Sequence, residues 1–395
     1  MANVSSSNGL EKRPKLRFPG FDEPWKATAF GNLVHEFSDR TKEDDEDILL
    51  SAAIEGMFLN TELFGHQRGA SNKGYKKIKY GTMVLSTQNL HLGNANVNQR
   101  FEHGMVSPAY KTYDITGCSV DLIAQWIKSE AAKRFFYNAT TVGASVCRRN
   151  VEWDTLYEQL LYLPCFEEQE KVAKFLALLS DRINKQQQFV SALKKYKRGV
   201  VSAILSHQVI FSDADGKSYP EWTSCTLQDA VDFLDGQRKP LESADRARRQ
   251  GVYPYYGASG IIDYIDDYIF DESLILLGED GANILNRSLP LCFIATGKYW
   301  VNNHAHVMRP KKGHNIKFLC ELLESLDYTR YNTGTAQPKL NQEKCRGIEL
   351  VLPRYEEQCR IADFLSSLDQ KVEQEQRNLE CLLLFKRGTM QQLFI

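Results

Sequence analysis

The sequence lacks a long apolar run, an excess of charge of either sign and any paired cysteine motif. No eighteen consecutive apolar residues occur, and the polar stretch 1–8 has no signal-peptide core, so we expect neither a membrane span nor an export signal. A formal net charge of −1 argues against one large basic surface but leaves room for local basic clusters. Nine cysteines without a C-x-x-C pair indicate reduced thiols, and we expect a cytoplasmic location. Without a G-x-x-x-x-G-K-[ST] motif, the chain is not expected to hydrolyse ATP.

What the chain does contain is a long internal duplication. The segment LPCFEEQ at 163–169 returns as LPRYEEQ at 352–358, an offset of 352 − 163 = 189 residues. The match continues without a gap for about forty residues and ends near KRG, which stands at 197–199 and again at 386–388. A duplication of this period predicts two similar halves related by a pseudo-twofold axis, and duplex DNA has the same symmetry.

The duplication divides the chain into a frame and two variable regions. We expect an α+β protein in which two α/β domains are separated by two long antiparallel helices that form a coiled coil. The predicted parts are a disordered tail, a first domain, a first long helix, a second domain and a second long helix, at 1–16, 17–162, 163–207, 208–351 and 352–395. The two variable regions resemble each other poorly, which suggests two readers with different targets on one scaffold.

The repeated segments are predicted to be helices with an apolar heptad seam. A proline and two acidic residues open each segment, and no proline follows in either one. Each helix would be about 60 Å long. The expected seam positions, polar interruptions included, are Leu179, Ile183, Gln186, Val190, Leu193 and Lys197 in the first helix, and Leu368, Val372, Glu375, Leu379, Leu382 and Lys386 in the second.

An antiparallel pairing of these helices can be given a register from its polar interruptions. If paired residue numbers sum to 572, Gln186 faces Lys386 and Lys197 faces Glu375. This choice keeps each seam lysine opposite a polar residue, and an unpaired buried charge would cost several kcal/mol. We therefore predict this register.

The duplicated motifs resemble those of the specificity subunit of type I restriction–modification systems. The resemblance rests on Pro-x-x-Glu-Gln-x-x-Ile/Val-Ala-x-Phe-Leu followed by Lys-Arg-Gly, which occurs twice at half-protein spacing. The entry motif at 18–21, the stretches 255–261, 278–283 and 302–306, and the segment YNTGTAQPKL at 331–340 also resemble that family. The first half departs from the pattern, because its glycine loop at 141–146 has no Gln-Pro-Lys.

The resemblance implies a specific task. Each variable region would be a target recognition domain that reads one half of a bipartite, asymmetric site in double-stranded DNA, and the helices would fix the spacing between the half-sites. Such a subunit is not an enzyme. It binds two methyltransferase subunits and, in the full complex, the restriction subunits, so S-adenosylmethionine, ATP and Mg²⁺ are expected on those partners. The chain also has no Asn-Pro-Pro-aromatic run for holding a flipped adenine.

Candidate DNA-binding residues are basic and amide side chains in glycine-containing loops, because Arg and Lys read guanine while Asn and Gln read adenine. In the first domain the candidates are Lys76, Lys77, Lys79, Asn89, Asn94 and Arg100. In the second domain they are Gln237, Arg238, Lys239, Gly257, Ser259, Asn283, Arg287, Lys298, Asn302, Asn303 and Lys339, with the backbone amides of Gly257 and Ser259 as phosphate donors.

Two other functions stay open at this point. Glu279, Asp280 and Lys298 could form the carboxylate–lysine cluster of a Mg²⁺-dependent nuclease. A coiled-coil scaffold without affinity for DNA would explain the helices but not the divergent regions. His304 and His306 would share one face of a strand, yet no ligand partner stands at metal-site spacing, so we expect no metal site.

Overall fold

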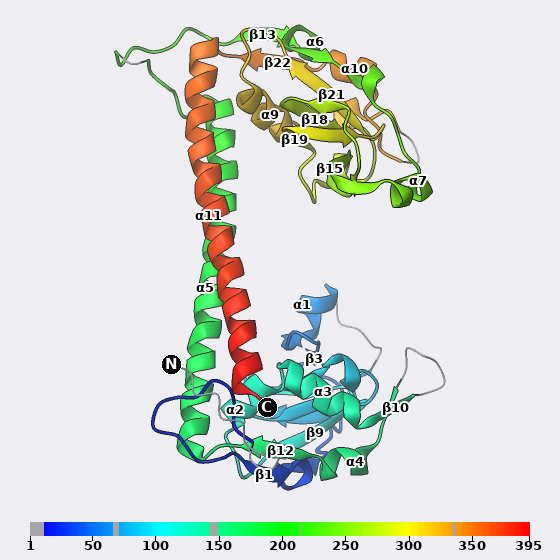
Figure 1. The fold of residues 1–395 in the computed structure, drawn as a ribbon, viewed down its shortest axis with the longest axis vertical. Coiled ribbons are helices and arrows are strands. Elements are labelled where there is room, and N and C mark those ends of the chain that lie inside the picture. Colours follow the sequence, from blue (N-terminus) through cyan, green and yellow to red (C-terminus); the bar gives the residue numbers. More distant parts are fainter. Residues whose placement is uncertain (1–11, 66–70, 143–148, 214, 335–336) are drawn as a thin grey trace. The chain divides into compact units, whose positions relative to one another are not determined.

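The computed structural model describes residues 12–65, 71–142, 149–213, 215–334 and 337–395, and the chain divides into two compact units. The first unit runs to Gln187 and includes Arg377–Ile395. The second unit is Gln188–Gln376. Two long helices, α5 (Phe166–Leu205) and α11 (Tyr355–Leu393), each contribute one part to either unit (Figure 1).

The first unit is built on a four-stranded antiparallel sheet in the order β2-β9-β6-β7. These strands are Val34–Phe37, Tyr110–Ile115, Met83–Ser86 and Ala95–Val97. Shorter two-stranded pairs surround it, namely β1 (Lys26–Ala29) with β12 (Leu160–Leu163), β3 (Leu50–Ala52) with β4 (Met57–Leu59), β5 (Lys76–Lys79) with β8 (His103–Val106), and β10 (Thr140–Val142) with β11 (Arg149–Val151). The helices are α1 (Asn60–Phe64), α2 (Val120–Trp126), α3 (Glu130–Asn138) and α4 (Trp153–Glu158).

The second unit has a four-stranded antiparallel sheet of the same topology, β14-β21-β18-β19. Its strands are Val231–Phe233, Ala305–Pro310, Leu274–Gly278 and Cys292–Ala295. A second sheet, β16-β15-β20-β17, is formed by Gly260–Ile265, Gln250–Gly257, Lys298–Val301 and Phe270–Asp271. The remaining elements are the pair β13 (Thr223–Thr226) with β22 (Glu349–Leu352) and the helices α6 (Leu227–Ala230), α7 (Ser243–Arg248), α8 (Asn283–Asn286), α9 (Ile316–Ser325) and α10 (Gln342–Arg346).

Each variable region is closed by a two-stranded ribbon directly before a long helix. In the first unit β1 pairs with β12 from Lys26 opposite Leu163, and in the second β13 pairs with β22 from Thr223 opposite Leu352. The ribbon joins the start and the end of each variable region, so each copy of the duplicated frame holds one insert. This arrangement gives the internal repeat its structural form.

A glutamine of the duplicated motif fastens each long helix to its unit. Gln169 accepts a hydrogen bond from the backbone N–H of Ser119 at 2.8 Å and donates to the carbonyl of the proline five residues before it at 3.0 Å. Gln358 makes the same two bonds, with the N–H of Asn315 at 2.9 Å and with its own preceding proline at 2.9 Å. Ser119 and Asn315 are the N-cap residues of α2 and α9. The motif therefore binds the helix that packs beside it.

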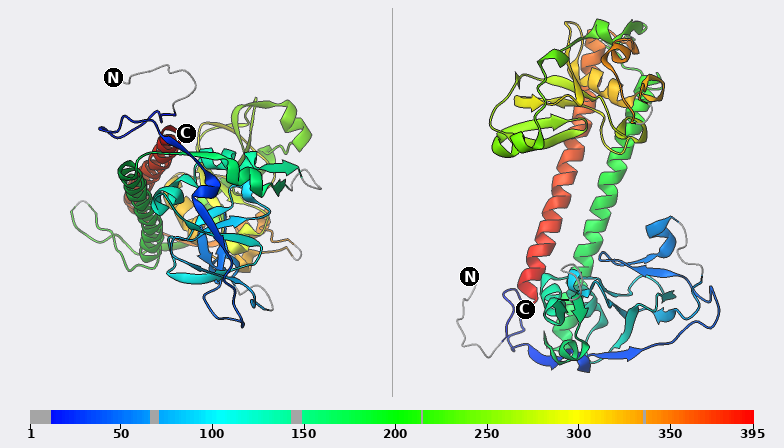
Figure 2. Two further views of the ribbon diagram at one scale, coloured as in Figure 1. Left: turned by 90° about the horizontal axis from the view of Figure 1, so that it is seen from below. Right: turned by 90° about the vertical axis from the view of Figure 1, so that its right-hand side faces the viewer.

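Within each unit the segments of α5 and α11 run in opposite directions (Figure 2). In the first unit Leu179 and Ile183 of α5 cluster with Leu379 and Leu382 of α11. In the second unit Val201 and Ile204 of α5 share a core with Ile361 and Leu365 of α11. α9 belongs to that same core through buried residues such as Phe318, so the variable region rests on both helices.

The twelve expected seam positions all lie at buried or half-buried places on the two helices. The predicted register, however, is wrong. Lys386 donates to the hydroxyl of Ser180 at 2.7 Å, and Lys197 pairs with Asp369 at 2.6 Å. The numbers of each pair sum to 566, six residues from the predicted 572. Glu375, expected opposite Lys197, instead bonds Lys371 at 2.7 Å.

The register prediction failed because it considered only seam residues of the two long helices as partners for Lys197 and Lys386. Lys197 also reaches Glu321 of α9 at 2.6 Å, and Lys317 of α9 joins both Glu321 and Asp369. Ser180 donates its own hydrogen to the Leu176 carbonyl, which leaves its oxygen to accept from Lys386. Glu321 of α9 and the hydroxyl of Ser180 thus bind Lys197 and Lys386 in place of the seam partners that the sequence suggested.

The expected disordered tail can be compared with the structure over residues 12–16. The expected tail 1–16 is described only from Lys12, whose carbonyl accepts from Trp25 at 3.0 Å, while the Leu16 N–H donates to Gln392 at 3.1 Å. Residues 12–16 are therefore part of the fold.

None of the helices that the structure describes is long and apolar enough to cross a lipid bilayer.

Candidate nucleic-acid interface

The basic candidates of the first unit are all engaged in contacts within that unit. Lys76 is 6% exposed and donates to the Tyr110 carbonyl at 2.7 Å, and burial lowers the pKa of its ammonium group. Lys77 pairs with Glu46 at 2.6 Å and Lys79 with Asp114 at 3.1 Å. Of these three, only Lys79 keeps most of its side chain exposed, at 67%.

The remaining candidates of the first unit do not converge on the lysines. Arg100 makes a two-pronged ion pair with Glu62, at 2.6 and 2.9 Å, and lies over the Phe101 ring. Asn89 is exposed and Asn94 half-buried, and both belong to the β6–β7 connection. Arg100 follows β7, so it lies at the opposite end of the hairpin from the two asparagines. The first unit therefore presents no single cluster of the predicted residues.

In the second unit most candidates gather at one edge, where β18 ends and β21 begins. The Asn302–His304 turn leads into β21, and the segment 235–239 runs beside it. Residues 337–340 are joined to the end of β18, since Leu340 N–H donates to Glu279 at 2.7 Å and Gly281 N–H to Pro338 at 3.0 Å. The β15–β16 turn lies against the same strand end, because a side chain at Gly278 would come within 2.6 Å of the Ala258 carbonyl oxygen. We call this region the β18–β21 edge.

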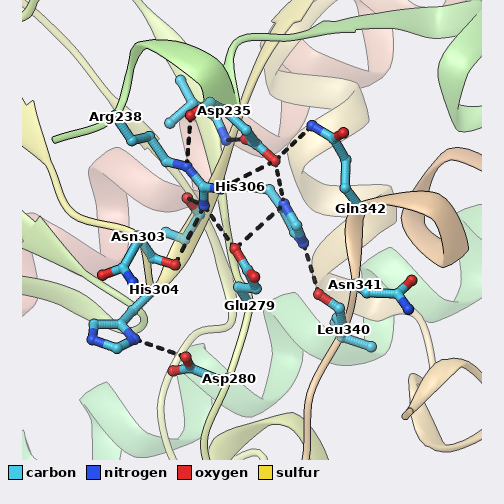
Figure 3. A network of polar contacts seen from close by, with 12 residues as sticks. Asp235, Arg238, Glu279, Asp280, Asn303, His304, His306, Leu340, Asn341 and Gln342 are labelled. Carbon is cyan, nitrogen blue, oxygen red and sulfur yellow. Dashed lines mark hydrogen bonds and ion pairs between the residues drawn. The ribbon is translucent and has the colours of Figure 1, made fainter. Parts of the chain in front are cut away.

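Beneath the edge lies a network of charged side chains (Figure 3). Arg238 donates to Glu279 at 2.7 Å and to the Ala305 carbonyl at 2.7 Å, and its side chain is 14% exposed. Glu279 also pairs with Lys339 at 3.3 Å. Arg238 was predicted to read DNA, but these contacts make it an internal support of the edge.

His306 is the buried centre of this network and carries a positive charge. Its Nδ1 lies 2.6 Å from Asp235 and its Nε2 lies 2.8 Å from the Leu340 carbonyl, so both ring nitrogens face acceptors and both must donate. Burial alone would lower the pKa of His306, but the hydrogen bond to Asp235 and the nearby Cys345 raise it to about 10. Although burial opposes this as well, the bond from His306 lowers the pKa of Asp235.

Asp235 holds three segments together. Besides His306, it accepts from the Val307 N–H at 2.8 Å and from the Gln342 side chain at 2.8 Å. Asp235, His306 and Gln342 were missed in the sequence, because nothing local marks them as partners. The one signal was the unusual density of polar residues at 302–306 and 331–342 within an otherwise apolar pattern.

Exposed side chains remain above this network. Gln237, Lys239, Asn303 and Lys339 are exposed, and Ser259 is half-buried. Three other candidates have structural tasks: Asn302 is 5% exposed and accepts from the His304 N–H, Gly257 is buried, and Asn283 holds the loop after α8 through bonds to Leu289. The edge can therefore present amide and ammonium groups outward while charged residues support it from within.

Arg287 and Lys298 lie away from the edge. Arg287 pairs with Glu324 at 2.9 Å and lies over the Tyr328 ring. Lys298 lies over the Tyr268 ring at 4.6 Å, and its backbone stands opposite that of Asp271 in the pairing of β17 with β20.

The position of Lys298 contradicts the nuclease alternative. Asp271 precedes β18, whereas Glu279 and Asp280 follow it, and the five residues of β18 span about 16 Å. The two acids bind Arg238, Lys339 and His304 instead. Glu279, Asp280 and Lys298 therefore do not form the predicted cluster, and the lysine that pairs with Glu279 is Lys339.

The expectation that His304 and His306 share one strand face is also wrong. β21 begins at Ala305, so His304 belongs to the preceding turn, with its side chain 49% exposed against 1% for His306. Figure 3 shows His304 turned towards Asp280 and away from His306. Within the described ranges, no group of three or more His, Cys, Asp or Glu side chains could hold a metal ion.

Comparison with known proteins shows which family this chain resembles. Residues 219–382 match the family model of the type I restriction modification DNA specificity domain. A putative type I restriction enzyme specificity subunit of Haemophilus influenzae is 33% identical over 149 residues, which cover 38% of this chain and 37% of that protein. The EcoprrI specificity subunit of Escherichia coli is 26% identical over 257 residues, which cover 60% of this chain and 61% of that protein. The matched parts thus span less than two thirds of either relative.

Solved structures show the same fold. The S subunit of a type I restriction–modification system from M. genitalium aligns with a TM-score of 0.58 and 15% identity, over 97% of this chain and 99% of that chain. A chain from a structure on complex assembly and conformational transition of the type I R-M system aligns with a TM-score of 0.57 and 14% identity, over 95% and 98%.

Proposed function

We propose that this chain is the specificity subunit of a type I restriction–modification complex, the non-catalytic subunit that reads DNA, because residues 219–382 match the type I DNA specificity domain and the chain is similar to such subunits. Each variable region would read one half of a bipartite, asymmetric site. The observation that carries the proposal is the duplicated frame, which holds two inserts of similar sheet topology but different loops. Two different readers on one frame would give discrimination at both half-sites, with about 1–3 kcal/mol for each mismatched base pair.

The β18–β21 edge is the proposed reading surface of the second region. Gln237, Asn303 and Lys339 are exposed there and have the donor groups that base edges and phosphates accept. The charged network below would keep the loops in place, and a positioned donor loses less entropy on binding. In the first region the exposed Lys79 and Asn89 support a different surface, which agrees with a different half-site.

We also propose that two methyltransferase subunits dock on equivalent grooves of the long helices, and that restriction subunits join the full complex. One groove, of about 490 Å³, includes Phe385, Gly388, Thr389 and Gln392. Another, of about 460 Å³, includes Tyr196, Gly199, Val200 and Ala203. The four helix residues of one groove correspond one to one with those of the other at the offset of 189, and the first groove is also lined by Leu16, Arg17 and Phe18. The helix surface is therefore the part that one type of partner would meet twice.

The test of this function is expression of the chain with its methyltransferase in cells whose DNA is then sequenced for methyladenine. A bipartite motif with a fixed unread spacer is expected. Absence of any motif in the presence of both proteins would contradict the function, and a motif produced by the methyltransferase alone would assign the reading elsewhere.

The docking proposal has its own variants. Gly199 and Gly388 have open space where a side chain would begin, so Gly199→Leu and Gly388→Leu should fill the grooves without disturbing the helices. Each single variant is expected to bind one methyltransferase instead of two in analytical ultracentrifugation. Unchanged stoichiometry in both variants would contradict docking at these grooves. Leu178→Ala, an exposed position outside either groove, is the matched control.

A further inference from the structure

The β18–β21 edge holds one titratable side chain that neither the supporting network nor the predicted contacts use. We propose that His304 binds a DNA backbone phosphate and takes up one proton as it does so. The inference rests on the proposed function, because it assigns a ligand to one residue of the same surface.

His304 is held in place at three points. Its N–H donates to the Asn302 side chain at 2.8 Å, and its carbonyl accepts from the Glu279 N–H at 2.8 Å. Its ring Nδ1 lies 2.7 Å from the carboxylate of Asp280. The backbone of Asp280 forms a β-bridge with that of Lys339, so the residue that binds the ring is itself held between the end of β18 and residues 337–340.

The contact with Asp280 decides what the other ring nitrogen can bind. A carboxylate accepts, so Nδ1 carries a hydrogen and a neutral ring would present Nε2 as a bare acceptor. A phosphate oxygen is also an acceptor and cannot bind that form. Once protonated, Nε2 donates, and the phosphate and Asp280 stabilise the ring from opposite sides. Among the described residues, Nε2 has no hydrogen-bond partner.

The charges around His304 favour this proton uptake. Asp235 and Glu279 pair with Arg238, and Glu279 also pairs with Lys339, whereas Asp280 makes its ion-pair contact with His304 at 2.7 Å. Protonation of His304 would therefore neutralise the charge of Asp280. An approaching phosphate favours the protonated state, so DNA binding and proton binding must strengthen each other.

The surroundings of His304 favour phosphate over a base edge. Arg238 is occupied by Glu279, but Lys339 stands opposite Asp280 in a backbone bridge and keeps 50% of its side chain exposed, so a charged donor that suits phosphate lies beside His304. Phosphate contacts fix orientation without carrying sequence information. The role of His304 would therefore be to set affinity, while exposed amides such as Asn303 set the sequence.

The experiment measures binding of the chain with its methyltransferase to a fluorescent duplex that carries the motif found in vivo, between pH 5.5 and 8.5. Affinity should fall with rising pH by up to about tenfold per pH unit, the limit for one linked proton. His304→Ala should bind more weakly at pH 6 and lose that pH-dependent component. His304→Lys, with a permanent charge, should keep the binding at pH 8. Asp280→Asn should move the transition to lower pH.

The matched control is His103→Ala, which removes another exposed histidine bonded to a carboxylate, Asp47 at 2.6 Å, outside the β18–β21 edge. It should keep the wild-type pH profile. A full pH dependence in His304→Ala would overturn the proposal. So would a methylated motif relaxed at one position in that variant, since this outcome would assign His304 to a base. If the wild-type complex yields no motif, the proposed function fails and not this inference alone.

Discussion

The two units carry the same lysine at the same place in the duplicated helix and surround it differently. Lys197 of the second unit has Asp369 and Glu321 around it, with Lys317 completing the cluster. Its counterpart at the offset of 189, Lys386, has Ser180, which in turn corresponds to Asp369. The duplication has kept the geometry of the contact and changed its charge. A seam position therefore fixes where a side chain lies, while the neighbouring variable region decides how it is neutralised.

The glutamate before each fastening glutamine shows the same divergence. Glu168 is fully buried and is bound by Arg17 through two bonds of 2.8 Å. Glu357, also buried, meets the Trp222 side chain instead, and its Oε2 has no partner among the described residues. Burial raises the pKa of Glu357. The negative charge of Glu168 is therefore stabilised by a cation, whereas burial disfavours the negative charge of Glu357.

The largest contrast is expected from this pair. Arg17→Met leaves the Glu168 carboxylate buried without a cation and should destabilise the first unit by about 3 kcal/mol. Glu357→Gln keeps an acceptor for Trp222 and removes a buried charge, so the second unit should change by less than about 1 kcal/mol. Urea unfolding, with hydrogen exchange read separately in each unit, measures both values. Equal losses in the two units would end the distinction.

The two lysines should differ in sign. Lys197→Met leaves Asp369 and Glu321 with only Lys317 between them, and a loss of about 2 kcal/mol is expected. Lys386→Met removes a cation whose pKa is lowered by burial and whose described partner is neutral, so a change between zero and a gain of about 1 kcal/mol is expected. The same unfolding measurement decides. A loss of stability in Lys386→Met as large as that in Lys197→Met would show that the serine contact is as strong as the ion cluster.

Alkaline pH should affect the units in opposite ways. The raised pKa of His306, about 10, means that its stabilisation is complete below the unfolded value near 6.5 and is lost as the pH rises through 10. The lowered pKa of Lys386 means that the first unit gains stability as that group loses its proton on the way to alkaline pH. Each effect is about 1.4 kcal/mol per pH unit at most.

Thermal unfolding between pH 8 and 10.5 isolates these two groups when wild type is compared with His306→Gln and Lys386→Met. Each variant should reduce the pH dependence of its own unit only, and in the first unit Lys128, whose pKa burial lowers to about 8, should leave a remainder. If His306→Gln left the alkaline loss in the second unit unchanged, another group would have to be its cause.

The smallest expected effect is one on which the units agree. Gln169→Ala and Gln358→Ala each leave a buried backbone N–H and a proline carbonyl without a partner, for a loss of about 1–2 kcal/mol. Because the bonds match, the two losses should be equal within error. A difference above about 1 kcal/mol would mean that other contacts in one copy compensate for the hydrogen bonds that the glutamine loses.

The sequence predicted the frame well because its determinants are local. The proline, the acidic start and the heptad spacing of 163–205 and 352–393 specify helices without reference to the rest of the chain, and α5 and α11 follow within a few residues. The register and the site were harder, because their partners are distant in sequence. Lys197 pairs with Glu321 of α9, and Arg238 is held in the interior of the unit by its ion pair with Glu279.

The most direct test of the central claim, that two independent readers stand on one duplicated frame, is to exchange residues 223–351 for the second variable region of another family member. The hybrid is expressed with the methyltransferase, and the modified DNA is sequenced for methyladenine. The prediction is that one half of the motif changes while the other half and the spacer length stay as in the wild type. If both halves changed together, or if neither changed, the two regions would not be separate readers and the proposed function would be wrong.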